Sequence, residues 1–115
     1  MIYHIAKYED FMLSKSGGSY FPNQYLLDGF IHCSTKEQVL SVANTWFLKS
    51  NNLVILEIDE QKLNVTINYE NMEGGLDLYP HVYGEIPMSA ISRYSYFVAK
   101  SLGFSFPTEW IETEQ

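Results

Sequence analysis

The apolar residues of this chain gather in short runs that are typical of β-strands. Runs rich in aromatic and β-branched residues cover residues 1–6, 30–33 and 53–58. The last run, Leu-Val-Ile-Leu-Glu-Ile, is the strongest of the three, and we expect it in the centre of a sheet. Further strands are predicted at residues 65–70, 81–83 and 92–100, where the first and last segments alternate between apolar and polar side chains.

Two segments have the 3–4 residue spacing of one apolar helical face. Residues 8–16 predict a short helix that ends at Gly17 and Gly18, because glycine readily takes the left-handed conformation of a helix C-terminus. A second helix is expected after Ser34 or Thr35, since both positions match the capping-box pattern. Its apolar stripe consists of Val39, Val42, Ala43, Trp46 and Phe47.

The order of these elements favours an α+β fold. A strand–helix–strand–helix start is followed by several strands, which predicts two main helices on a mixed or antiparallel sheet that splits in two. Residues 19–28 are expected to form an irregular connection with one helical turn after Pro22. After Gly103 the pattern of apolar and polar residues weakens. We expect Phe104, Phe106 and Trp110 to pack part of this segment against the rest of the domain.

The composition favours a single folded domain and disfavours nucleic acid and membrane as partners. The chain has 115 residues, of which 46% are hydrophobic and 18% charged, so a single folded domain is expected. The formal net charge is −7 and Arg93 is the only arginine, which disfavours nucleic acid as a partner. There is no apolar run of the roughly 20 residues that a membrane helix needs, and the first residues do not resemble a signal peptide. We therefore expect a cytoplasmic protein with no membrane partner.

The three histidines are the strongest candidates for chemistry. His4, His32 and His81 each fall on a predicted strand, so neighbouring strands would line one cleft with three imidazoles, whose ordinary pKa lies near neutrality. Alternation along the second strand places Phe30 and His32 on one face and Cys33 on the other. A nucleophilic pair of His32 and Cys33 is therefore disfavoured, and Cys33 is expected to be a small buried residue.

Each candidate also has a purely structural interpretation. His32 comes just before a predicted helix whose first backbone amides, near Ser34 and Thr35, could hold a phosphate or a ribose hydroxyl. In the structural interpretation, the His32 side chain instead fixes its strand by a hydrogen bond to a backbone carbonyl. His81 is either an imidazole held at a strand end or a satisfied polar residue in an edge strand. Glu70 has two functional interpretations, since it could stabilise a developing cation or take a proton. Its structural interpretation is a solvated glutamate at the end of a strand.

A metal site is not expected from this pattern. Three histidines can bind zinc with one open position. However, no two of them have the local spacing of a helix-borne metal motif, and Cys33 is the only cysteine. Phosphate loops and dinucleotide fingerprints are absent from the sequence as well.

Three motifs carry a resemblance to a known family. They are Tyr3-His4-Ile5-Ala6, Asp28-Gly29-Phe30-Ile31-His32-Cys33-Ser34-Thr35, and Pro80-His81-Val82-Tyr83-Gly84. With them, residues 1–106 resemble a domain of the small, mostly bacterial family of unknown function numbered 952 (DUF952), and residues 107–115 form a C-terminal tail. That family is similar to the ADP-ribosyltransferase fold, which includes RNA phosphotransferases that consume NAD.

The resemblance implies a nucleotide-like small molecule as partner, with NAD as the possible substrate and cleavage of the nicotinamide–ribose bond as the reaction. By resemblance, His4 orients a ribose, His32 lies near the nicotinamide ribose, and His81 or Glu70 supplies the third catalytic position. The residues implied in binding are Tyr3, His4, His32, Ser34, Thr35 and Tyr83. The arginines that hold phosphates in the RNA phosphotransferases have no counterpart, so a non-catalytic binding module and an interaction protein stay as alternatives.

Overall fold

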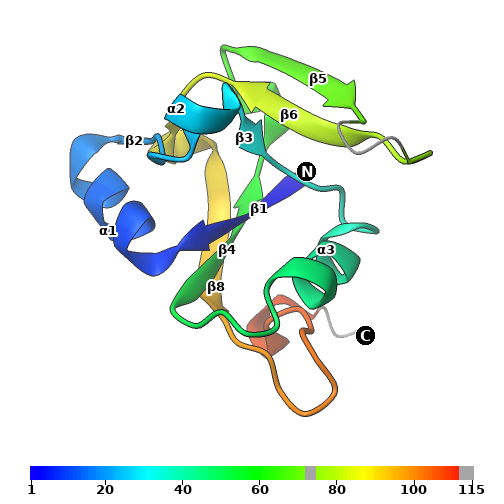
Figure 1. The fold of residues 1–115 in the computed structure, drawn as a ribbon. Coiled ribbons are helices and arrows are strands. Elements are labelled where there is room, and N and C mark those ends of the chain that lie inside the picture. Colours follow the sequence, from blue (N-terminus) through cyan, green and yellow to red (C-terminus); the bar gives the residue numbers. More distant parts are fainter. Residues whose placement is uncertain (72–74, 112–115) are drawn as a thin grey trace, which may run out of the picture.

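The computed structural model describes residues 1–71 and 75–111, which form an α+β fold with antiparallel sheets (Figure 1). The strands are β1 (Ile2–Lys7), β2 (Ser19–Tyr20), β3 (Ile31–His32), β4 (Leu53–Ile58), β5 (Thr66–Glu70), β6 (Tyr79–Tyr83), β7 (Ile86–Pro87) and β8 (Ile91–Phe97). The helices are α1 (Tyr8–Gly17), α2 (Tyr25–Asp28) and α3 (Val39–Trp46), with single 3₁₀ turns at Glu60–Lys62, Met88–Ala90 and Thr108–Trp110.

The first sheet has the order β1-β4-β8, and both pairings are antiparallel. Strand β4 lies in the middle and all six of its residues are buried, which confirms the prediction of a central strand. Its side chains face two separate apolar clusters. Ile2 and Ala6 of β1 belong to one cluster with Phe11 of α1, whereas Tyr3 belongs to the other with Val39 of α3. The two main helices therefore cover opposite faces of this sheet.

The second sheet carries two of the three histidines. Its order is β3-β6-β5, again antiparallel, and β6 is the middle strand. The interpretation of His81 as a residue of an edge strand is therefore wrong, because β6 pairs with a strand on each side. An isolated bridge between Tyr3 and Ser34 joins β1 to the chain just after β3. A third, two-stranded sheet pairs β2 with β7.

The helices differ from the prediction mainly at their ends. Gly18 takes the left-handed conformation (φ 84°) after α1, as expected. The short helix α2 supplies the turn predicted after Pro22. Helix α3 begins at Val39, later than the predicted cap, because a turn comes first in which the Thr35 N–H donates to Oε1 of Gln38 at 3.0 Å. This bond is one half of the capping box.

The segment after β8 is part of the folded body in its described portion. Phe104 and Trp110 are 5% and 8% exposed and belong to the second apolar cluster, where Phe106 packs against them. Figure 1 shows this segment beside α3. Among residues 1–71 and 75–111, no helix combines the length and the apolar character needed to cross a membrane.

Candidate functional site

Strand pairing brings His32 and His81 together. The two residues are direct partners in the β3–β6 ladder, so their side chains leave the sheet on the same face. Their ring centroids are 5.5 Å apart in an edge-to-face arrangement. Phe30 precedes β3 and stacks on His81, with ring centroids 4.0 Å apart and an interplanar angle of 17°. The exposed imidazole of His32 thus stands beside a buried aromatic pair.

Glu70 connects His81 to Tyr83. The His81 Nδ1–H donates to Oε1 of Glu70 at 2.8 Å, and the Tyr83 hydroxyl donates to the same oxygen. These bonds lower the pKa of Glu70, the tyrosine bond having the larger effect, and the carboxylate in turn raises the pKa of Tyr83. The His81 side chain is 3% exposed and the Glu70 side chain 33%. Glu70 is therefore a bound carboxylate rather than a solvated strand end.

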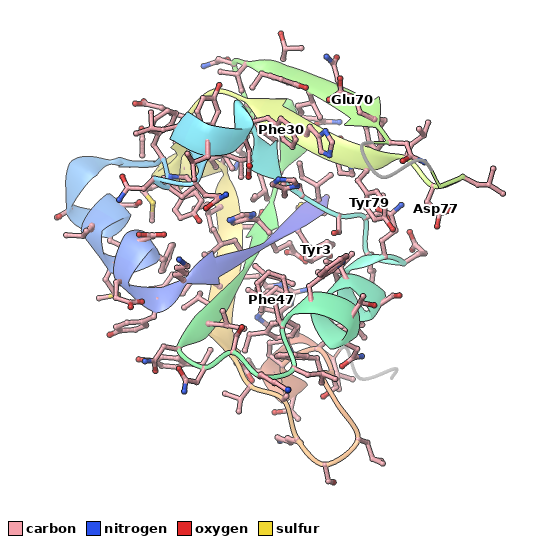
Figure 2. All side chains as sticks on the ribbon, in the orientation of Figure 1. Tyr3, Phe30, Phe47, Glu70, Asp77 and Tyr79 are labelled. Atoms are coloured by element: carbon pink, nitrogen blue, oxygen red, sulfur yellow. The ribbon has the colours of Figure 1, made fainter. Side chains whose placement is uncertain are left out.

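Asp28 holds His32 in the same way. The His32 Nε2–H donates to Oδ2 of Asp28 at 2.9 Å, and the His32 side chain is 58% exposed. Asp28 ends α2, and Gly29 (φ 81°) takes the left-handed conformation that turns the chain into β3. We refer to Asp28, Phe30, His32, Glu70, His81 and Tyr83 as the histidine cluster; Figure 2 labels Phe30 and Glu70.

His4 contacts this cluster only through the backbone of His32. Its Nδ1–H donates to the backbone carbonyl of His32 at 2.5 Å, and its Nε2 accepts the hydroxyl of Tyr20 at 2.7 Å. A carbonyl can only accept, so Nδ1 carries a proton, and in the neutral ring Nε2 is the nitrogen that accepts the Tyr20 hydroxyl. Burial lowers the pKa of His4 from 6.5 to about 4. Two imidazoles meet, and the third fixes the backbone of one of them.

The other residues implied in ligand binding divide between two places. Tyr83 belongs to the histidine cluster. Tyr3 faces the opposite side of β1, where its hydroxyl donates to Oε2 of Glu57 at 2.8 Å; burial and this bond raise its pKa to about 12. Ser34 is buried and pairs with the backbone of Tyr3, and Thr35 supports the turn before α3. Figure 2 shows Tyr3 toward α3 and away from Phe30.

Cys33 lies on the face of β3 opposite His32, as alternation predicted. It is 3% exposed within the first apolar cluster, and burial raises the pKa of its thiol. The thiolate, which is the nucleophilic form, is therefore disfavoured. Within the described part of the chain, no three or more His, Cys, Asp or Glu side chains come close enough together to hold a metal ion.

Sequence reasoning did not assign roles to Asp28 and Phe30. Both belong to the motif at residues 28–35. An acidic residue four positions before a histidine could have indicated a carboxylate that binds the imidazole. Their geometry explains what the site offers chemically. His32 and His81 each use one ring nitrogen to bind a carboxylate, which orients the ring. Because only the His32 side chain is exposed, its other ring nitrogen is the one that remains accessible for proton transfer or for a hydrogen bond to a ligand.

Comparison with known proteins places the chain in one family. The model of the family described as "Protein of unknown function (DUF952)" matches residues 5–94, and the chain belongs to this family. No curated protein matches it. Solved structures similar to this chain include the crystal structure of protein CC0527 from Caulobacter crescentus, with a TM-score of 0.78, 30% identity and 90% coverage of each chain. The solution NMR structure of CC0527 gives 0.76 and 30%, covering 90% of this chain and 89% of the other.

Proposed function

We propose that the histidine cluster binds a small nucleotide-like ligand, with NAD as the first candidate, and that the domain is of the ADP-ribosyltransferase type. The observation that carries this proposal is the exposed imidazole of His32 beside a buried aromatic pair and a bound carboxylate, Glu70. Such a surface offers a stacking partner and hydrogen-bonding groups to a ligand that contains a planar base and a ribose.

The proposed reaction is cleavage of the nicotinamide–ribose bond. The bond breaks with its electron pair going to nicotinamide, and the ribose carbon gains oxocarbenium character before water or another acceptor adds to it. Glu70 is ionised at neutral pH, as any carboxyl with an ordinary or lowered pKa is, and its bonds to His81 and Tyr83 fix the position of this negative charge, which stabilises such a cation. His32 positions the ribose, and His81 holds the carboxylate in place.

The role of His4 follows from its contacts. Because both ring nitrogens already bind the protein, at His32 O and Tyr20 Oη, His4 is a positioning residue that supports the backbone of β3. We assign to it the orientation of His32 rather than a contact with the ribose itself.

A non-catalytic interaction module is the second candidate. Helix α2 exposes Leu26 and Leu27, which are 76% and 81% exposed, next to Asp28 of the cluster. Exposed apolar side chains beside a polar site are a feature of surfaces that bind protein partners. In that case the histidine cluster would contribute the polar contacts of the interface.

The first experiment is a thermal-shift titration with NAD, ADP-ribose and nicotinamide. Wild type should be stabilised by NAD or ADP-ribose, and His32→Ala should lose this shift, since binding to the folded state alone raises the melting temperature. Without ligand, His32→Ala should melt near wild type because the His32 side chain is 58% exposed. Leu102→Ala, at a residue that is 99% exposed, serves as the matched surface control. No shift with any of the three compounds would refute the ligand proposal.

A second experiment separates binding from chemistry. Glu70→Gln keeps an oxygen that accepts from His81 and Tyr83 but removes the negative charge. We expect this variant to bind NAD within a few-fold of wild type and to release no nicotinamide by chromatography. If wild type binds NAD without releasing nicotinamide, the site is a binding module; if Glu70→Gln releases it as fast as wild type, Glu70 does not stabilise the cation.

A further inference from the structure

A hollow lies on the face of β1 opposite His4. It has a volume of about 300 Å³ and is lined by Tyr3, Lys36, Arg93, Phe106, Trp110 and Ile111. Because successive side chains of a strand point to opposite faces, Tyr3 brings this hollow to the side of β1 that His4 does not occupy. It is therefore separate from the histidine cluster, and it does not depend on the function proposed for that cluster.

Aromatic rings form the floor of the hollow. The ring of Tyr3 meets that of Phe106 edge-on, with centroids 5.8 Å apart and an interplanar angle of 63°, and lies 6.4 Å from the Trp110 ring. Trp110 is 8% exposed and Phe106 is half-buried, so the two rings are fixed by packing and still line an accessible space. Rigid aromatic walls favour a flat apolar ligand.

Two cationic residues, Lys36 and Arg93, line the hollow, and the carboxylates of Glu57 and Glu37 lie near enough to act on Tyr3. Arg93 donates to both oxygens of Glu57, at 2.9 and 3.0 Å, so this pair is close to neutral. Its guanidinium carbon also lies 4.6 Å from the centroid of the Trp110 ring, which fixes the arginine against the floor. Lys36, on the turn before α3, is exposed and forms no hydrogen bond or ion pair with the residues that the structure describes. One positive charge is thus available at the rim.

We propose that this hollow binds a small planar carboxylate, with the ring against Phe106 and Trp110 and the carboxylate at Lys36. A volume of about 300 Å³ fits a ligand with one ring. The Lys36 ammonium supplies the positive charge for the ligand's carboxylate, which the neutral Arg93–Glu57 pair does not. The aromatic rings supply most of the contact area for the ligand's ring. Benzoate has this chemistry and is the probe for the test.

The experiment is a benzoate titration followed in the ¹H–¹⁵N NMR spectrum of the full chain. The indole N–H signal of Trp110 should shift and saturate, with a Kd on the order of 1 mM for so small a ligand. The indole of Trp46, which is 68% exposed and does not line the hollow, is the internal control and should not shift in parallel. Benzamide keeps the ring without the charge and acetate keeps the charge without the ring, so both should bind more weakly than benzoate.

Lys36→Gln tests the charge. This exposed side chain can be replaced without disturbing the core, and the variant should bind benzoate roughly three- to fivefold more weakly. Lys49→Gln removes an equally exposed lysine elsewhere and should bind like wild type, as should His32→Ala of the histidine cluster. An unmoved Trp110 signal, or benzamide binding as tightly as benzoate, would overturn the proposal. Unchanged affinity in Lys36→Gln would do the same.

Discussion

The buried imidazole of His4 should make the stability of this protein depend on pH in a defined window. In the neutral ring, Nδ1 donates to His32 O and Nε2 accepts the Tyr20 hydroxyl. Protonation would make Nε2 a donor too, so the Tyr20 hydroxyl would have to accept instead, and it would place a positive charge where little water reaches it. The pKa of His4 accordingly falls from 6.5 to about 4, mainly because of burial.

The sign and size of the effect follow from this shift. Above pH 6.5 the His4 ring is neutral in both the folded and the unfolded state, so the stability it supports is fully present. As the pH falls from 6.5 to about 4, the unfolded chain binds a proton and the folded chain does not, and the free energy of unfolding decreases. The full shift is worth about 3 kcal/mol at about 1.4 kcal/mol per pKa unit. Because the residue keeps some contact with solvent, we expect a loss of about 2 kcal/mol.

The assay is urea unfolding of wild type and His4→Gln between about pH 7 and about pH 4.5. Glutamine can donate to one neighbour and accept from the other without titrating, so subtracting its profile removes the contribution of carboxylates such as Glu70. Wild type should lose about 2 kcal/mol more than the variant over this range. Parallel profiles would refute the reasoning, and so would an NMR titration that finds His4 at an ordinary histidine pKa.

Three further perturbations have expected outcomes. Glu57→Gln removes the charge of the buried carboxylate that Arg93 and Tyr3 bind. It should lower the free energy of unfolding in urea by about 2 kcal/mol, less than for a fully buried pair because Arg93 is 39% exposed. Gly84→Ala would place a Cβ in collision with Cγ1 of Val65 at a φ of 154°, and it should lower the free energy of unfolding by about 2 kcal/mol or more. Cys33 should react with a thiol reagent far more slowly in the folded protein than in urea.

Two control variants make the same chemical change at positions where the structure predicts little effect: Glu85→Gln for Glu57→Gln, and Gly17→Ala for Gly84→Ala. Glu85→Gln neutralises an exposed glutamate and should leave the unfolding curve nearly unchanged. Gly17→Ala adds a methyl group that meets no atom within 4 Å at the end of α1, and it should be neutral or slightly stabilising. If Gly84→Ala were as harmless as Gly17→Ala, the contact with Val65 would not limit that turn. Rapid labelling of the native thiol would contradict the burial of Cys33.

Strand alternation predicted the orientation of the candidate residues correctly. The periodicity of two places His32 and Cys33 on opposite faces, and the structure agrees, because one side chain is 58% exposed and the other residue 3%. In the same way, Tyr3 and His4 are neighbours in β1 and lie on opposite faces of it. The position of β4 was predictable for a related reason, since a strand without alternation has to be buried on both faces.

Sequence periodicity could not predict which strands pair. The expectation that all three imidazoles share a cleft required a particular strand order, and order depends on the packing of distant segments. Here β6 lies between β3 and β5, which pairs His81 with His32 on one side and brings Glu70 near it on the other. The role of Asp28 likewise depends on the left-handed turn at Gly29, whose direction a local pattern does not specify.

The strand β1 explains how an exposed imidazole can have a defined position. The backbone of Tyr3 exchanges two hydrogen bonds with Ser34, at 2.7 and 2.8 Å, while the side chain of His4 donates to the carbonyl of His32. On the other side, the Cys33 N–H donates to the carbonyl of Pro80 at 3.0 Å. The backbone at His32 is thus held from both sides, and Asp28 fixes the ring. A group that is held in this way loses little further freedom when a ligand binds, which is the property that the ligand site proposed at His32 requires.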